Sequence, residues 1–297
     1  MQAVLPFPDI SPEVFSISLF GMEFALRWYA LAYIGGILLG ALLVRRALKR
    51  ASLWANDTAP MAPSQLDDLL FWIVLGVILG GRLAFVFVYQ PEYYLSHPAD
   101  ILKIWQGGMA FHGGFVGVCL ATFLWCRANN VPLASTADAL ALGTPIGLLL
   151  GRISNFINAE LWGRPTDVPW GVVFPGAAAQ DCPGVAGACA RHPSQLYEAG
   201  LEGLVLGLIL IIAVWRFGAL RRRWLLTGMF FAGYGIARFI VEFYRLADRQ
   251  FITPDNPFGH VLRLGDTMGI TMGQVLSLPM IIVGAVIIAV ALRRTAR

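Results

Sequence analysis

Long runs of apolar residues alternate with short polar segments along the whole chain of 297 residues. A membrane-spanning helix needs roughly 20 mostly apolar residues, and about seven runs of that length occur. They lie near residues 24–44, 68–90, 108–126, 136–155, 197–215, 225–244 and 274–292. Because an α-helix satisfies its own backbone hydrogen bonds in lipid, the pattern predicts an all-α polytopic membrane protein with about seven transmembrane helices.

The composition excludes an ordinary soluble domain. The chain is 57% hydrophobic and 13% charged, with a mean hydropathy of +0.67, whereas a soluble domain carries about 25% charged residues. The short alternating strands of a membrane β-barrel are not the pattern seen here. The net charge is +4. We take the positions of the basic residues as an indication of how the chain is oriented in the membrane, and we expect no nucleic-acid partner.

The basic residues predict how the chain is oriented in the membrane. They gather after the first, third, fifth and seventh predicted spans, within 45–50, at 127, within 216–223 and within 293–297. Since cytoplasmic loops carry the excess of Lys and Arg, we expect the N-terminus outside, in the periplasm, and the C-terminus in the cytoplasm. The chain is then one domain, 1–297, with a small outer head formed mainly by 163–195 and joined by the outer loops 91–107 and 246–272.

A polar stretch, "GRISNFINAELWGRPTD" (151–167), begins at the outer end of the fourth predicted span. On a helix, Arg152, Asn155 and Asn158 follow one another at intervals of about 60° and form one polar stripe. Arg offers a planar fork that suits phosphate, and Asn offers both a donor and an acceptor. A phosphate within lipid belongs to a phospholipid headgroup, so the stripe predicts a headgroup site at the outer face.

Other charged residues lie within or at the ends of the predicted spans, where each costs about 2.5–3.5 kcal/mol at a helix centre. Such residues can mark a functional site, or they can form Arg–Glu pairs that hold helices together, as Arg238 and Glu242 could at a spacing of four. Arginines exceed carboxylates near the outer face, which leaves positive charge for an anion. The set comprises Arg27, Arg82, Asp138, Arg152, Glu160, Glu198, Glu202, Arg238, Glu242 and Arg245.

A histidine flanked by small residues, His112 in "GGMAFHGGFVG", lies at the outer end of the third predicted span. Its imidazole could act as a general base near neutral pH, or it could only form a structural hydrogen bond. No zinc-binding cluster, GxSxG elbow or P-loop is present. These patterns favour a group transfer that needs neither a metal nor another cofactor.

The four cysteines divide into two pairs. Cys119 and Cys126 lie in the third predicted span, where cysteine is usually a small apolar packing residue. Cys182 and Cys189 lie in "DCPGVAGAC", in the longest outer loop. An oxidising compartment permits a disulfide there, but the sequence alone does not establish that the two are bridged.

The stretch 151–167 resembles the signature of the bacterial prolipoprotein diacylglyceryl transferases. Other stretches match that family in order along nearly the whole chain: "RWYALAY" (27–33), "GGRLAF" (80–85), "GGMAFHGG" (107–114), "RHPSQLYE" (191–198), "GYGIARFIVEFYR" (233–245) and "MGQVLSLPM" (272–280). The resemblance implies transfer of the diacylglyceryl group from phosphatidylglycerol to the lipobox cysteine thiol in a prolipoprotein signal peptide, with release of glycerol phosphate. It also implies a location in the bacterial inner membrane with the site open to the periplasm.

The resemblance also implies residue roles. Arg152 matches the signature arginine that binds phosphatidylglycerol, and Arg152, Arg238 and His112 are the catalytic candidates. The arginines would hold the leaving phosphate, while His112 would either accept the thiol proton or only position the headgroup. Ala159 stands where many members have glycine. The remaining candidates for substrate binding are Tyr29, Arg82, Asn155, Asn158, Glu160, Gly163, Tyr234, Glu242 and Arg245.

The alternative function is a membrane transporter of an anionic lipid or solute. Many transporters show internal repeats or interrupted helices in matching halves. The chain shows no such symmetry, and the resemblance favours the transferase.

Overall fold

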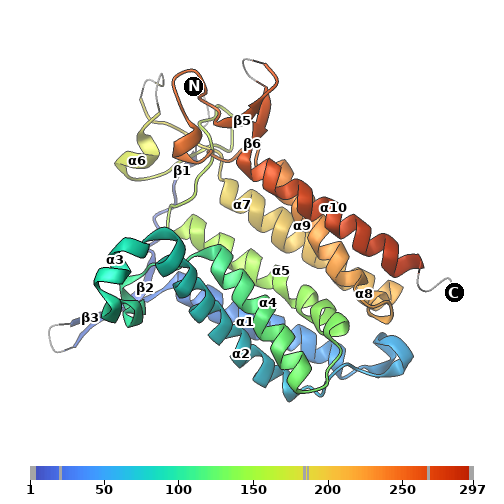
Figure 1. The fold of residues 1–297 in the computed structure, drawn as a ribbon. Helices are drawn as coiled ribbons and strands as arrows, with labels where there is room; N and C mark the ends of the chain where they lie inside the picture. The colour runs from blue at the N-terminus through green and yellow to red at the C-terminus, as the bar shows by residue number, and fades with distance from the viewer. Residues whose placement is uncertain (1–4, 20–21, 183–184, 186, 266–267, 294–297) are drawn as a thin grey trace. The chain divides into compact units, whose positions relative to one another are not determined.

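The computed structural model describes residues 5–19, 22–182, 185, 187–265 and 268–293. The chain divides into two compact units, one formed by Met1–Val44 with Asp138–Arg297 and the other by Arg45–Ala137. Figure 1 shows the ribbon coloured along the chain. These are called the first unit and the second unit, respectively.

Six helices in the described part of the chain are long and apolar enough to cross a membrane. They are α1 (Trp28–Leu48), α2 (Gln65–Ala84) with its extension to Tyr89, α4 (Phe111–Ala128), α5 (Leu133–Ile157), the continuous helix Ser194–Phe217 and α10 (Met272–Arg293). The all-α polytopic fold class is thereby confirmed. The sixth predicted span, 225–244, corresponds to a shorter apolar helix, α9 (Leu225–Val241), which has 17 residues because the chain turns after Val241.

The start of the first predicted span is wrong by a few residues. The structure places a β-hairpin there, formed by β2 (Glu13–Leu19) and β3 (Met22–Arg27), and the helix begins only at Trp28. The two strands are antiparallel, with Arg27 opposite Glu13. Residues 24–27 therefore satisfy their backbone groups by pairing with a neighbouring strand instead of within a helix.

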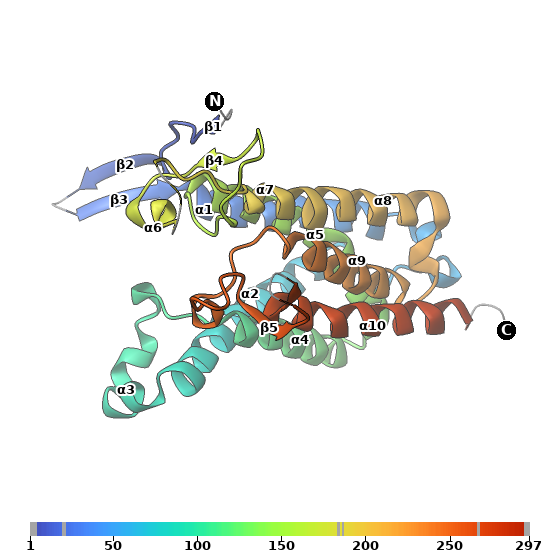
Figure 2. The same cartoon turned by 90° about the horizontal axis from the view of Figure 1, so that it is seen from above.

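Glycines allow helices of the first unit to pack closely. A Cβ atom on Gly36 of α1 would lie 2.9 Å from the Cα atom of Gly147 on α5, and one on Gly40 would lie 3.0 Å from the carbonyl oxygen of Gly143. Figures 1 and 2 show α9 and α10 side by side in the same unit. The small residues at intervals of four thus pack helix backbones against one another, as expected in lipid.

Short strands and loops of the first unit gather beyond the first turns of α7 and α10, at the end opposite to the C-terminus (Figure 1). There β1 (Leu5–Pro6) pairs in parallel with β4 (Val172–Val173), and β5 (His260–Arg263) pairs antiparallel with β6 (Gly269–Thr271). The helix α6 (Ala177–Gln180) lies in the same region. A small apolar core forms around Val172, Phe174 and Ala179.

The second unit is built on α2 and α4, which pack through glycines. A Cβ atom on Gly80 would lie 2.3 Å from the carbonyl oxygen of Gly113, so only glycine fits there. Five short helices complete the unit: η1 (Ala51–Leu53), η2 (Ala55–Asp57), α3 (Pro91–Ser96), η4 (Pro98–Leu102) and η5 (Ile104–Gln106). A π-helical turn, η3 (Phe85–Tyr89), extends α2.

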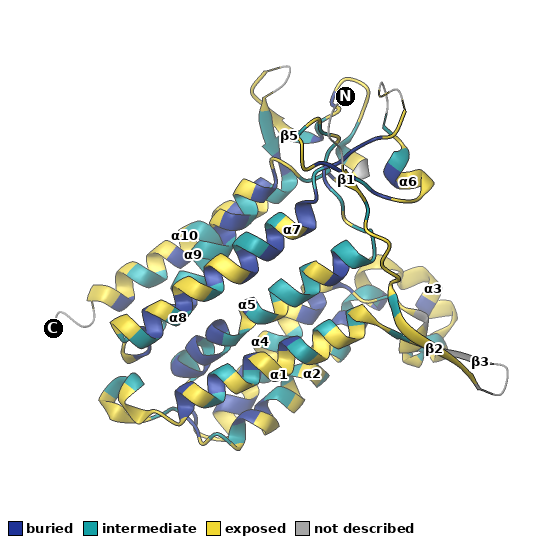
Figure 3. Ribbon diagram, turned by 180° about the vertical axis from the view of Figure 1, so that it is seen from behind, coloured by how far each residue is buried: buried dark blue, intermediate teal, exposed yellow. Residues whose placement is uncertain are grey.

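The distribution of polar residues is that of a membrane protein. Large apolar side chains are exposed along the outward faces of the long helices, as the exposed positions on α8 and α10 in Figure 3 show. The fully buried side chains include Glu198, Glu202, Gln195 and Asp138. Since charged residues are almost never fully buried without partners, the buried carboxylates identify where the polar interior of the first unit lies.

Candidate active site

The helix Ser194–Phe217 carries two buried carboxylates of the first unit. It consists of α7 (Ser194–Glu198), a π-helical segment η6 (Ala199–Val205) and α8 (Leu206–Phe217). Glu198 and Glu202 are four residues apart, and the side chains of both are fully buried. A π-helical segment within an α-helix often occurs at a functional site, and here it lies between the last turn of α7 and the apolar α8.

Three arginines from other segments converge on Glu198. Its carboxylate lies 2.9 Å from Nε of Arg152 on α5, 2.7 Å from Nη1 of Arg238 on α9 and 2.6 Å from Nη1 of Arg245 just after α9. One carboxylate therefore joins α5, α7 and α9. Ion pairs of this kind are shorter and stronger than neutral hydrogen bonds, and they fix the three guanidinium groups relative to one another.

Two further glutamates complete the cluster. Oε2 of Glu242 lies 2.9 Å from Nη2 of Arg238 and 3.6 Å from Nε of Arg245, so the ion pair expected at a spacing of four is present. Glu202 lies 3.8 Å from Nη2 of Arg152. The described residues thus place three arginines with three glutamates, and the excess of arginine expected from the sequence is not found in this cluster.

The arginines lie on the open side of the cluster and the glutamates behind them. The side chains of Arg152, Arg238 and Arg245 are 17–20% exposed, whereas those of the three glutamates are at most 6% exposed. An approaching anion would therefore meet guanidinium N–H groups first. The planar fork of arginine suits a phosphate, so the cluster can bind a phosphate group while the carboxylates hold the arginines in place.

The turn after α5 is held by side-chain amides. The amide of Asn155 donates to Oε1 of Glu160 at 2.8 Å, and the amide of Asn158 donates to the same oxygen at 3.5 Å. The Gln195 amide donates to the backbone carbonyl oxygen of Glu160. Ala159, in this turn, has a φ of 51°, a left-handed conformation that glycine adopts without strain. Glycine, which the resemblance leads us to expect at this position, would adopt this conformation without strain.

Gly163 is required by a close approach of three backbone segments. A Cβ atom there would lie 2.4 Å from the carbonyl oxygen of Tyr244 and 2.8 Å from that of His192. The Gly163 amide donates to the His192 carbonyl at 2.9 Å, and Gly163 also forms a bridge with Arg245. The next residue, Arg164, donates through Nε to the Arg245 carbonyl at 2.7 Å. The signature turn is thus bonded directly to the segment that carries Arg245.

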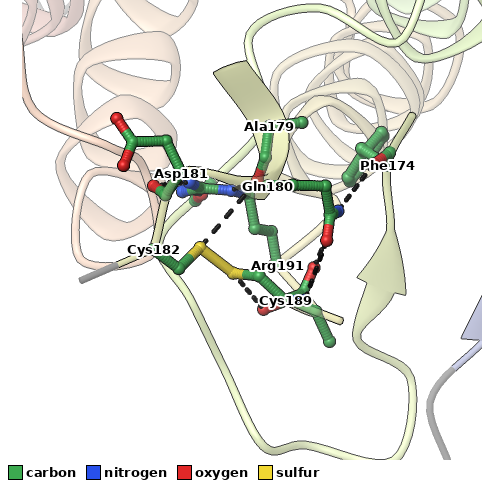
Figure 4. Close-up of a disulfide and its surroundings, with 9 residues drawn as sticks. Phe174, Ala179, Gln180, Asp181, Cys182, Cys189 and Arg191 are labelled. Atoms are coloured by element: carbon green, nitrogen blue, oxygen red, sulfur yellow. Dashed lines mark hydrogen bonds between the residues drawn. A yellow bond between two sulfur atoms is a disulfide. The ribbon is translucent and has the colours of Figure 1, made fainter. Parts of the chain in front are cut away.

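The disulfide Cys182–Cys189 closes a loop of the first unit (Figure 4). The buried Arg191 donates to the carbonyl oxygens of Ala179 at 2.6 Å and Asp181 at 2.9 Å, and it also reaches the carbonyl oxygen of Gly163 at 3.3 Å. Arg191 therefore links the disulfide loop to the signature turn. This residue was not a candidate from the sequence, because its partners are backbone carbonyls distant along the chain.

Aromatic side chains and a histidine lie next to the cluster. Nδ1 of His192 lies 3.1 Å from the Tyr197 hydroxyl, which also accepts from Nε1 of Trp170 at 2.7 Å. The ring of His192 packs edge-on against that of Tyr244. Burial, and next the charge of Arg164, lower the pKa of His192 below its ordinary value, so the imidazole is neutral at neutral pH. His192 is a further titratable group of this region that sequence reasoning did not single out.

The two tyrosines expected at the site belong to the same unit as Arg152. Tyr234 on α9 lies within electrostatic range of Arg152, Glu202 and Arg238. Tyr29 on α1 accepts a hydrogen bond from the Tyr33 hydroxyl at 3.2 Å. Tyr33 in turn lies within electrostatic range of Arg152. The first unit thus brings together Arg152, Tyr234 and the neighbourhood of Tyr29.

The second unit holds the other two candidates, Arg82 and His112. The buried guanidinium of Arg82 donates to five backbone carbonyls: those of Ile101, Gly107, Gly108, Asp100 and Lys103, at 2.6–3.4 Å. An arginine has five N–H donors, so these carbonyls occupy the whole group. Arg82 therefore holds the 100–108 segment in place, and its role in substrate binding stays a prediction.

His112 is exposed at the start of α4, beside a mostly apolar groove between α2 and α4 with a volume of about 620 Å³. Its ring packs edge-on against Phe111. The role of His112 as a base or as a positioning group stays a prediction.

Comparison with known proteins identifies relatives along almost the full chain. The family model described as prolipoprotein diacylglyceryl transferase matches residues 15–290. A phosphatidylglycerol–prolipoprotein diacylglyceryl transferase of Ruegeria pomeroyi is 63% identical over 284 residues, which are 96% of each chain. Proteins of the same name from Roseobacter denitrificans and Cereibacter sphaeroides are 62% and 60% identical, over 97% and 99% of this chain and 98% and 100% of their own. The chain therefore belongs to the prolipoprotein diacylglyceryl transferase family.

Proposed function

We propose that this protein transfers the diacylglyceryl group of phosphatidylglycerol to the cysteine thiol of a prolipoprotein, with release of glycerol phosphate. The observation that carries the proposal is the cluster of Arg152, Arg238 and Arg245 in front of buried glutamates in a membrane-spanning unit. Intramembrane charge is costly, and a lipid phosphate is the anion that reaches such a site from the bilayer. The substrates follow from the names of the relatives.

The arginines would act on the lipid phosphate both before and during the reaction. They bind the phosphate of the lipid, and they stabilise the negative charge that grows on that phosphate as the bond between the glyceryl carbon and oxygen breaks. The thiolate is the form of the cysteine that attacks, and a new carbon–sulfur bond replaces the carbon–oxygen bond. The thiol proton goes either to His112 or to solvent, and the arginines favour the thiolate in the second case.

We further propose that the protein lies in the bacterial inner membrane with the arginine cluster toward the periplasm. The support is the distribution of basic residues, which favours a cytoplasmic location for the loops after α1, α4, α8 and α10. The acceptor would then be the lipobox cysteine of a signal peptide already delivered to the outer face. The Cys182–Cys189 disulfide is in keeping with an oxidising compartment.

A transfer assay with the purified protein tests the function. The protein is placed in nanodiscs that contain phosphatidylglycerol labelled in its acyl chains and is incubated with a lipobox peptide. We expect the peptide to gain the label and the mass of one diacylglyceryl group, while a peptide with Ser in place of Cys gains neither. Phosphatidylglycerol labelled in its terminal glycerol should release labelled glycerol phosphate at the same rate. Movement of lipid between leaflets without labelling of the peptide would instead favour a transporter.

A further inference from the structure

Glu202 differs from the other glutamates of the cluster in how poorly it is paired. Its side chain is fully buried, and neither carboxyl oxygen has a hydrogen-bond partner among the described residues. Its nearest cation is Nη2 of Arg152 at 3.8 Å. Glu198, which is equally buried, has three guanidinium groups within 2.9 Å. An ionised carboxylate left in this setting would lose its hydration without gaining strong contacts in return.

The charged and titratable groups around Glu202 come from its own helix, from α5 and from α9 with the residues that follow it. Glu198 lies one turn earlier on the same continuous helix, Arg152 belongs to α5, and Tyr234 and Arg238 belong to α9. Arg245, after α9, also lies within electrostatic range. The arginines among these groups are already paired with Glu198 and Glu242 at shorter distances.

The charge balance of the cluster depends on the state of Glu202. With all six side chains ionised, three arginines and three glutamates cancel, and a bound phosphodiester would leave a buried net charge of minus one. With a proton on Glu202, the cluster carries plus one, and the phosphodiester cancels it. Because uncompensated charge is costly in the membrane, the lipid binds best when Glu202 is neutral.

We propose that Glu202 carries a proton when the lipid binds and thereby leaves the positive charge of Arg152 available to the phosphate. Glu202 is thus a positioning residue that acts through Arg152 and does not touch the substrate. This inference rests on the proposed function, since it takes the lipid phosphate as the ligand of the cluster. When Glu202 loses its proton, its carboxylate competes with the phosphate for Arg152, and lipid binding weakens as the pH rises.

Infrared difference spectroscopy tests the proton directly. The spectrum of the wild-type protein is compared with those of Glu202→Gln and Glu198→Gln, all in nanodiscs that contain phosphatidylglycerol. We expect Glu202→Gln to remove a carbonyl band of a protonated carboxyl group, which shifts on exchange into deuterated water. Glu198→Gln, the matched control on the same helix face, should remove only carboxylate bands. Loss of carboxylate bands alone in Glu202→Gln overturns the proposal.

Binding of labelled phosphatidylglycerol over a pH series provides the second test, and it requires no transfer. In the wild-type protein the dissociation constant should rise with pH, whereas in Glu202→Gln it should stay within about threefold across the series, because the amide cannot ionise. Glu198→Gln should weaken binding at every pH, by roughly 100-fold. A Glu202→Gln variant that binds as poorly as Glu198→Gln, or that keeps the wild-type pH dependence, contradicts the role of Glu202.

The two proposals fail in different ways. If the wild-type protein binds phosphatidylglycerol but does not label the lipobox peptide, the proposed function is wrong and the binding series still decides the role of Glu202. If the peptide is labelled while binding does not depend on the Glu202 proton, the proposed function stands and the inference is wrong.

Discussion

Replacement of Glu198 by glutamine tests the central claim that one carboxylate holds three arginines. Glutamine keeps the shape of the side chain and one carbonyl acceptor, so at most part of the network of Arg152, Arg238 and Arg245 survives. Removing one partner of a buried ion pair costs about 3–5 kcal/mol, because the other charge stays buried. Domains are stable by about 5–15 kcal/mol, so Glu198→Gln should fold and be substantially less stable.

The effect on transfer follows from the same contacts. Without the carboxylate, the three guanidinium groups repel one another and lose the geometry that faces the phosphate. A 1 Å misplacement of a reacting group can cost on the order of 100-fold in rate. We therefore expect kcat/KM for the lipobox peptide to fall by at least that factor.

The assay compares unfolding free energies in one detergent, with Glu13→Gln as the control. Glu13 pairs with Arg27 at 3.6 Å, and the two side chains are 38% and 66% exposed, so this pair is worth about 0–1 kcal/mol at most. If Glu198→Gln loses no more stability than Glu13→Gln, the reasoning that the buried carboxylate organises the site is refuted.

Four further outcomes follow from single positions. Arg152→Ala should reduce transfer by about 100- to 1,000-fold, and Arg152→Lys should recover little of it, since an ammonium lacks the planar fork; near-normal activity of either variant would exclude the headgroup role. Ala159→Gly should raise the unfolding free energy by up to about 1 kcal/mol, because Ala159 has a left-handed φ of 51° that is strained for alanine and not for glycine; a lower unfolding free energy would show that the backbone at Ala159 is not strained. Replacing Cys182 and Cys189 together by Ser should cost about 2 kcal/mol, and labelling without reductant should leave both unlabelled in the wild type. If His112 is the base, His112→Gln should keep lipid binding and lose about 10²–10⁴-fold in turnover, and the loss should shrink as the pH approaches the thiol reference pKa of about 8.5; weakened lipid binding with no rescue at high pH would assign His112 to positioning.

The membrane helices were predictable because a span is a local property of the sequence. Twenty apolar residues in a row need no distant partner to form a helix in lipid, and six predicted spans correspond to long apolar helices. The hairpin that ends at Arg27 was missed because residues 22–27 form a strand only by pairing with residues 13–19. The sequence around these strands has no strong turn signal, so the apolar run that begins there was interpreted as the start of a helix.

The members of the arginine–glutamate cluster were visible in the sequence, but their contacts were not, and the missed contacts share one cause. Arg152, Arg238 and Glu242 were found because charge within an apolar span is conspicuous by itself. Glu198 and Glu202 were visible for the same reason but were given no role, since their partners lie on α5 and α9. Arg82 was named a substrate-binding candidate because it is a charge within an apolar span, and its contacts with the backbone carbonyls of residues 100–108 could not be foreseen. Every residue carries a backbone carbonyl, so the sequence does not show which of them an arginine will contact.

The ion pairs that join separate helices have a consequence for the biogenesis of this protein. Arg152 reaches the membrane on α5, but Glu198 lies on the helix that follows, and Arg238 arrives only with α9. A charge that enters the lipid before its partner carries an insertion cost of about 2.5–3.5 kcal/mol at a helix centre. We therefore expect the insertion machinery to retain α5 until the helix Ser194–Phe217 has been synthesised, and then to release the two helices together as a neutralised hairpin.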